Sequence, residues 1–155
     1  MSNPVKQLRA LDLYPLPTPP EPAGAYTCAV RSGNLLFVAG QLPLRDGEIV
    51  FKGRVGQAIS EAEGYQAARL CAVNALSAIE AEVGLDAVTR IVRMTGYVSS
   101  AEGFSIQAGV VNGASELMKE VFSERGIHAR LAVGVTALPL DAAVELEVIA
   151  ELSAA

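Results

Sequence analysis

The chain has 155 residues, a formal net charge of −5 and a hydrophobic fraction of 51%. A chain of this length is expected to fold as one domain that buries about 70% of the surface exposed by its unfolded state, which is enough for a core without disulfides or metals. No run of about 18 apolar residues is found, so no membrane-spanning helix is predicted. The 12 lysine and arginine residues are scattered, which argues against a nucleic acid as the main partner because nucleic-acid binding needs clustered positive charge.

The N-terminal segment and the two cysteines bear on the location of the protein. The first residues, Met-Ser-Asn-Pro-Val-Lys-Gln-Leu-Arg, lack the apolar stretch of a secretion signal. Cys28 and Cys71 lie in apolar surroundings without a metal-binding spacing, and we expect them to be reduced thiols that pack as small core residues. A cytoplasmic location is therefore expected.

Residues 1–24 are predicted to form an N-terminal arm, and residues 25–155 a single domain. Five prolines between residues 11 and 24 favour an extended, polyproline-like course over the surface, because proline fixes its own backbone and lacks an amide donor. The arm is interpreted as a packing segment or a frayed tail. A docking motif for a partner is the alternative interpretation.

The first part of the domain has the pattern of β-strands. From Tyr26 to Gly40, alternating apolar residues surround a Ser-Gly-Asn turn at 32–34, which predicts a hairpin. A second turn at Asp46-Gly47 is followed by a short apolar stretch at 49–51, which predicts a further strand.

Two helices and a strand are predicted in the middle of the chain. Apolar residues spaced by three and four predict a helix over 60–83, and Ser60 with Glu63 forms a capping box at its start. Residues 90–99 have the pattern of a strand, and a second helix is predicted over 103–124.

The last third of the chain predicts two strands, within residues 128–150, joined by a tight Leu-Pro-Leu-Asp turn. If they form a simple hairpin about this turn, Arg130 faces Glu151 and Glu145 faces Thr136. The order of elements then predicts an α+β fold, with one mostly antiparallel six-stranded sheet and two helices packed on one face.

The sheet face away from the helices is expected to be small and mixed in polarity, which predicts association with another copy of the chain. The residues assigned to this face are Arg130, Ala132, Gly134, Thr136, Glu145, Glu147 and Ile149.

Arg130 is the strongest candidate for a functional residue. Three small residues follow it on its own side of the strand, so the guanidinium has open space beside it and can hold a small carboxylate. The alternative is an exposed ion pair with Glu151, which contributes only about 0–1 kcal/mol. His128 is the only histidine, and it is either a loop residue or an acid or base beside the anion site. A Ser-His-Asp set, a zinc ligand cluster and a glycine-rich phosphate loop are not evident, so no metal or cofactor is expected.

The chain resembles the Rid family, also called YjgF or L-PSP proteins, from about Gly24 to its end. The C-terminal signature is the most specific part of the resemblance, the Gly-Gln-Leu-Pro run is less specific, and the asparagine alone is weak. The matching residues are Ala129-Arg130, Leu138-Pro139, Val144-Glu145-Leu146-Glu147, Gly24-Ala25-Tyr26, the Phe37–Pro43 run and Asn112.

The resemblance implies a chorismate-mutase-like fold and a homotrimer with sites between subunits. It implies that Arg130 anchors a substrate carboxylate, that Glu145 positions the attacking water, and that Tyr26 lies near the pocket. Asn112 corresponds to an asparagine supplied by the adjacent subunit, and backbone groups around Ala132 are expected to bind the amine. From the residues alone, Tyr26 could equally serve in the core or an interface.

Two of these assignments have further alternatives. Glu145 could be a solvated carboxylate, and Glu147, on the same side of the strand, is a weaker candidate for its role. Many family members carry a serine and a cysteine after the arginine, whereas this chain has Leu131 and Ala132. A thiol at that position therefore has no part in the mechanism here.

The expected activity is that of an enamine/imine deaminase, which hydrolyses 2-aminoacrylate or related 2-imino acids to 2-oxo acids and ammonia without a cofactor. One alternative is a non-catalytic trimer that binds small carboxylates. An L-PSP-type endoribonuclease is a weaker alternative, because the protein is acidic and has a single histidine. The sequence does not indicate which imine is preferred.

Overall fold

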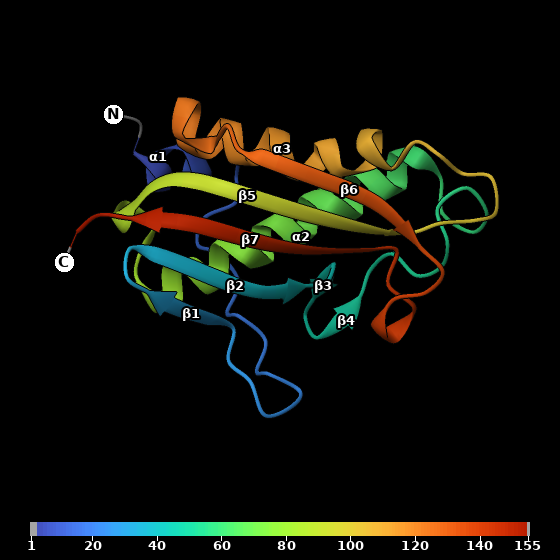
Figure 1. The fold of residues 1–155 in the computed structure, drawn as a ribbon, viewed down its shortest axis with the longest axis horizontal. Helices are drawn as coiled ribbons and strands as arrows, with labels where there is room; N and C mark the ends of the chain where they lie inside the picture. The colour runs from blue at the N-terminus through green and yellow to red at the C-terminus, as the bar shows by residue number, and fades with distance from the viewer. Residues whose placement is uncertain (1–2, 155) are drawn as a thin grey trace.

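A computed structural model describes residues 3–154 of the chain (Figure 1). A five-stranded sheet lies on one side, and α2 and α3 pack against one of its faces. The elements are, in chain order, α1 (Pro4–Ala10), β1 (Ala29–Ser32), β2 (Leu35–Gln41), β3 (Leu44–Arg45), β4 (Glu48–Ile49), α2 (Glu61–Glu82), η1 (Leu85–Ala87), β5 (Val88–Ser99), α3 (Gln107–Phe122), η2 (Ser123–Gly126), β6 (Ala129–Val135), η3 (Pro139–Asp141) and β7 (Val144–Leu152).

The predicted α+β class is confirmed, with a different strand count. The strand order of the sheet is β1-β2-β7-β5-β6, and all neighbours are antiparallel except β5 and β6. The strand expected at 49–51 does not join this sheet. Instead β3 and β4 pair as a separate two-stranded ribbon. Asp46 and Gly47 both have positive φ angles, 52° and 80°, so the chain turns back at once and the two strands pair locally.

The predicted C-terminal hairpin is wrong. β5 lies between β6 and β7, and β6 runs parallel to β5. The reason is that β6 follows β5 through α3, and a strand that returns after a helical crossover pairs in parallel. Arg130 is therefore aligned with Met94, and Glu145 with Tyr97. The expected pairings of Arg130 with Glu151 and of Glu145 with Thr136 are not formed.

The helix predicted at 60–83 is confirmed as α2. Its capping box is complete, because the Ser60 hydroxyl accepts from the Glu63 amide at 3.1 Å and the Glu63 carboxylate accepts from the Ser60 amide at 2.8 Å. The second predicted helix begins later than expected, at Gln107, and is followed by the 3-10 turn at Ser123–Gly126. Both helices and the sheet enclose one core, in which Leu76, Leu117 and Leu146 are fully buried.

The two helices approach each other closely through glycines. At Gly113 of α3 a Cβ atom would overlap the carbonyl oxygen of Tyr65 in α2, and at Gly64 of α2 it would lie 3.2 Å from the Val110 side chain of α3. Only glycine leaves room for this backbone contact. The position of α3 against the sheet, and of every side chain that it carries, therefore depends on these small residues.

Residues 3–16 of the N-terminal segment pack against the domain, whereas residues 17–24 are mostly exposed. Residues 11–24 contain no helix or strand, in keeping with their prolines, but they follow a short helix, α1, that was not predicted. Leu8 of α1 is fully buried, and Tyr14 and Leu16 pack against the core. Asn3 caps α1 by accepting from the Lys6 amide at 2.9 Å, and proline follows it at the first helical position.

The sheet face away from α2 and α3 is called the open face. On β7 the side chains alternate, so that Glu145, Glu147 and Ile149 lie on this face, as predicted, while their neighbours are buried under the helices. The expectation for β6 is wrong. Arg130 aligns with the fully buried Met94 and contacts α3, so it lies on the helix side of the sheet.

The rest of the predicted face also differs from expectation. Ala132 packs against the core, and at Gly134 a Cβ would lie 2.8 Å from the Gln107 side chain of α3, so both residues share the helix side with Arg130. Thr136 lies beyond the end of β6. The open face is instead more apolar than predicted, because it exposes large side chains from several strands: Val30, Leu35, Phe37 and Leu131.

Within residues 3–154, none of the helices is both long and apolar enough to cross a membrane.

Candidate functional site

Arg130 is held against α3 by three hydrogen bonds. Its Nη1 atom donates to Oδ1 of Asn112 at 2.7 Å and to Oγ of Ser115 at 3.2 Å, and its Nη2 atom donates to the Ala108 carbonyl at 3.3 Å. All three acceptors lie on one face of α3, at spacings of four and three residues. The guanidinium is only partly buried. It has donors beyond these three bonds, and a carboxylate could use them.

Asn112 supports Arg130 within its own chain. The resemblance implied that this asparagine serves the neighbouring subunit, whereas the structure shows it hydrogen-bonded to Arg130 of the same chain. This contact explains an asparagine in the middle of a helix, where its intrinsic propensity is poor. The structure therefore brings together two of the predicted site residues, Arg130 and Asn112.

His128 and Ser115 extend the same hydrogen-bonded group. His128 Nδ1 lies 2.7 Å from the Gly126 carbonyl oxygen, which can only accept, so Nδ1 carries the proton of the neutral ring. His128 Nε2 lies 3.0 Å from Ser115 Oγ and is then free to accept from that hydroxyl. Burial lowers the pKa of His128, and the charge of Arg130 lowers it further, while the bond to Gly126 opposes these effects. The neutral ring is thus the favoured form.

These side chains border a cavity of about 300 Å³ between α3 and the start of β6, which we call the Arg130 pocket. Its walls are Ser115, Glu116, Lys119, Gly126, Ile127, His128 and Arg130. Sequence reasoning missed Ser115. Its spacing of three from Asn112 places both on one face of the predicted helix and could have indicated it.

Glu145 lies on the open face, away from Arg130. Its carboxylate is half-buried and covers Gly40 of β2, where a Cβ atom would overlap it, and this contact accounts for the glycine of the Gly-Gln-Leu-Pro run. Burial raises the pKa of Glu145, and the nearby Glu147 raises it further. Arg130 and Glu145 are on opposite sides of the sheet, so they do not meet within one chain.

Tyr26 and Ala132 occupy opposite edges of the sheet. Tyr26 precedes β1 rather than lying on a strand, is 60% exposed, and accepts a weak hydrogen bond from the Ala23 amide at 3.4 Å. Ala132 lies on β6, aligned with Gly96 of β5. β1 and β6 are the two edge strands of the sheet (Figure 1). Because Tyr26 precedes β1 and Arg130 lies on β6, the two residues belong to opposite ends of the strand order within one chain.

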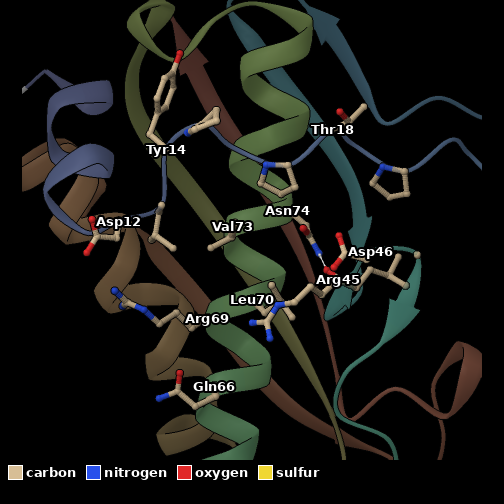
Figure 2. Close-up of a pocket in the computed structure, with 16 residues that line it drawn as sticks. Asp12, Tyr14, Thr18, Arg45, Asp46, Gln66, Arg69, Leu70, Val73 and Asn74 are labelled. Carbon is tan, nitrogen blue, oxygen red and sulfur yellow. Dashed lines mark hydrogen bonds between the residues drawn. The ribbon is translucent and has the colours of Figure 1, made fainter.

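A larger cavity than the Arg130 pocket, about 840 Å³, lies elsewhere. The N-terminal arm, the β3–β4 turn and α2 form its walls, and none of the predicted site residues lines it (Figure 2). Two of its polar side chains have structural partners. Arg69 pairs with Glu120 at 2.7 Å, and the Asn74 amide donates to the carbonyls of Leu42 and Leu44 at 2.9 and 3.0 Å. This cavity follows from the course of the arm across α2.

The fold and the Arg130 pocket define a class of small α+β proteins with an arginine clamped between an edge strand and a helix. The chain belongs to the family described as Endoribonuclease L-PSP, whose model matches residues 17–152, and whose relatives include the YjgF, RutC and Rid proteins.

Individual relatives cover most of the chain. Protein TCP17 of Trypanosoma cruzi is 44% identical over 140 residues, which are 89% of this chain and 88% of that protein. A RutC family protein of Pyrococcus abyssi is 34% identical over 133 residues, which are 84% of this chain and 89% of that protein.

Solved structures show two degrees of likeness. Atu1372 of Agrobacterium tumefaciens, of unknown function, is 39% identical, with a TM-score of 0.88 over 96% of this chain and 91% of that one. A Shewanella oneidensis protein proposed to be an endoribonuclease is 29% identical, with a TM-score of 0.93 over 97% and 99%. The YjgF product of E. coli is 27% identical, with a TM-score of 0.62 over 86% and 93%. The chain thus resembles the first two in shape more closely than it resembles YjgF.

Proposed function

We propose that this protein is an enamine/imine deaminase, which hydrolyses 2-aminoacrylate or related 2-imino acids to 2-oxo acids and ammonia without a cofactor. The observation that carries the proposal is Arg130, whose guanidinium is held in place by three hydrogen bonds to α3 and borders a pocket. Its place in the family signature supports the same role.

Hydrolysis of an imine requires few catalytic groups from the protein. The carbon of a protonated imine is already electrophilic, so the protein has to hold the substrate, orient one water and move a proton. Water adds to the imine carbon, and the resulting amino alcohol loses ammonia to leave the 2-oxo acid. A carboxylate on Arg130 would gain about 1.5–3 kcal/mol for each charge-assisted hydrogen bond.

A homotrimer is part of the proposal, because one chain does not bring the expected residues together. Glu145 on the open face and Tyr26 before β1 could reach the Arg130 pocket only from another copy. The open face offers an apolar surface for that contact, since Phe37 is 43% and Leu131 45% exposed. Light scattering after size exclusion tests this: we expect the mass of a trimer, and a Phe37→Asp variant should dissociate.

The test of the activity is hydrolysis of freshly generated 2-iminopropionate, followed by trapping with semicarbazide. Wild type should remove the imine faster than buffer does, and Arg130→Ala should not, although it remains folded. Arg90→Ala is the matched control, because Arg90 is an exposed arginine on β5 outside the pocket. Full activity in Arg130→Ala would contradict the assignment. No acceleration by wild type, combined with pyruvate binding in calorimetry, would favour the non-catalytic carboxylate-binding protein.

The family description favours a second candidate, an endoribonuclease. The net charge of −5 weighs against it, because RNA binding depends largely on neutralising phosphates. RNA cleavage that survives repurification and disappears in Arg130→Ala would support this candidate over the deaminase.

A further inference from the structure

We infer that His128 and Ser115 are the proton-transfer pair of the Arg130 pocket, with Ser115 passing protons between the substrate and His128 Nε2. This inference rests on the proposed deaminase function and adds two catalytic residues to it. The family resemblance assigned the positioning of the attacking water to Glu145, whereas the acid–base group that shares Ser115 with Arg130 in this structure is His128.

The hydrogen bonds around His128 determine which of its nitrogens can accept a proton. The Gly126 carbonyl holds the Nδ1 proton at 2.7 Å, and this leaves Nε2 as the acceptor that faces Ser115 Oγ at 3.0 Å. The same Oγ accepts from Arg130 Nη1 at 3.2 Å. A serine hydroxyl with a cation on one side and a basic nitrogen on the other is set up to give its proton to that nitrogen. Ser115 therefore contacts both Arg130, the carboxylate anchor, and His128, the base.

The backbone fixes this arrangement. At Gly126 a Cβ atom would overlap the Met118 carbonyl oxygen, so the turn between α3 and β6 is as tight as glycine allows. The Gly126 carbonyl, which orients the imidazole, is thereby fixed relative to α3. Ser115 is on α3 and His128 immediately precedes β6. The packing of α3 beside β6 therefore positions both side chains.

The remaining charged groups of the pocket do not compete for the role. Glu116 and Lys119 are on α3, and the Glu116 carboxylate accepts a hydrogen bond from the Tyr65 hydroxyl. The Lys119 side chain is exposed to solvent. The pKa of His128 is lowered by burial and by Arg130, which keeps the ring neutral and able to act as a base near pH 7.

The proton movements balance. As the water oxygen bonds to the imine carbon, its proton passes to Ser115 Oγ while the Ser115 proton passes to His128 Nε2, and the imine nitrogen becomes an amine. His128 then returns its proton through Ser115 to that amine. The C–N bond breaks, the hydroxyl group becomes the carbonyl of the 2-oxo acid, and ammonia leaves with the hydroxyl proton.

The variants separate proton transfer from substrate holding. His128→Asn retains an amide donor for the Gly126 carbonyl but has no Nε2, and Ser115→Ala removes the relay, while Ser115→Thr restores a hydroxyl. With 2-iminopropionate we expect His128→Asn and Ser115→Ala to lose at least about 100-fold in kcat, with KM changed less than about threefold, and Ser115→Thr to recover part of the loss. The acid limb of the wild-type pH–rate profile should vanish in His128→Asn.

A second measurement does not depend on turnover. Because His128 is the only histidine, ¹⁵N-histidine NMR reports a single ring. We expect the Nδ1-protonated tautomer in the free protein, and a rise of the His128 pKa when pyruvate binds, since its carboxylate offsets the charge of Arg130. Arg130→Ala should show no such rise on adding pyruvate.

The outcomes of these experiments distinguish the proton-transfer role of His128 and Ser115 from the deaminase function itself. If wild type hydrolyses the imine and His128→Asn does so equally well, the proton-transfer role is overturned and the deaminase function stands. The other tautomer, or a pKa that pyruvate leaves unchanged, also overturns the role. If wild type does not accelerate hydrolysis, the deaminase function fails, and the proton-transfer role fails with it.

Discussion

Gly113→Ala tests whether the backbone contact between α2 and α3 positions the site. The added Cβ would overlap the Tyr65 carbonyl oxygen and lie 2.9 Å from the carbonyl carbon, so the helices must separate. Backbone atoms cannot rotate away as a side-chain end can. Forcing one methyl group into such a packed contact costs about 1–3 kcal/mol, or more.

Gly109→Ala is the matched control in the same helix. Its Cβ would lie 2.9 Å from Oε1 of Glu61 and 3.0 Å from Cγ2 of Ile106, and the Glu61 carboxylate can swing aside. Both variants gain about 0.5–1 kcal/mol of helix propensity. The difference between them is therefore the packing cost alone, and Gly113→Ala should be less stable than Gly109→Ala by about 1–3 kcal/mol or more.

The assay is urea unfolding followed by far-UV circular dichroism, since the chain has no tryptophan. For a domain of this size, the difference corresponds to a Tm lower by about 2–12 °C in Gly113→Ala. All variants should be compared at one protein concentration, because association adds to apparent stability. Equal unfolding free energies for the two alanine variants would refute the argument that the glycine contact sets the helix spacing.

Three further predictions concern stability. Ser60→Ala should lower the unfolding free energy by about 0.5–2 kcal/mol, because it removes half of a complete capping box; an unchanged urea midpoint would contradict this. Thr95→Val should leave stability unchanged or raise it by about 1 kcal/mol in thermal unfolding, because the buried Thr95 hydroxyl has no partner among residues 3–154; a clear loss would mean that it is satisfied. The lowered pKa of His128 means that the unfolded chain binds a proton more readily than the folded one, so stability should fall as the pH drops from about 6.5 through the folded pKa. Urea titrations between pH 5 and 8 should show a smaller fall in unfolding free energy for His128→Asn than for wild type. An identical pH dependence in the two proteins would refute His128 as the source of the fall.

Local signals were sufficient for several elements. The capping box at Ser60 and the apolar spacing that follows it predicted α2 almost to the residue, because a helix start depends on contacts between neighbours in sequence. Asp46-Gly47 predicted a turn for the same reason. The Asn3-Pro4 pair carried an equally local signal for α1, and it was overlooked beside the prolines that follow.

The site was predicted only in part. Arg130 and Asn112 do meet, yet their contact within one chain was not expected, and Ser115 was not identified. The small residues after Arg130 were interpreted as open space for a ligand on the face away from the helices. They instead admit α3, because Gly134 leaves room for the Gln107 side chain and Gly96, next to Ala132, leaves room for Val111.

The sequence by itself determined the alternation of side chains along each strand, the start of α2 and the turns, since each depends on residues close together in the chain. Only the tertiary structure decided which face each strand presents. β6 pairs with β5 in parallel because α3 intervenes, and this pairing places Arg130 on the helix side with His128 and Ser115 and leaves Glu145 on the open face. The alternation of side chains along a strand specifies that neighbouring residues point to opposite faces of the sheet. Which of the two faces is covered by the helices depends on the strand with which it pairs.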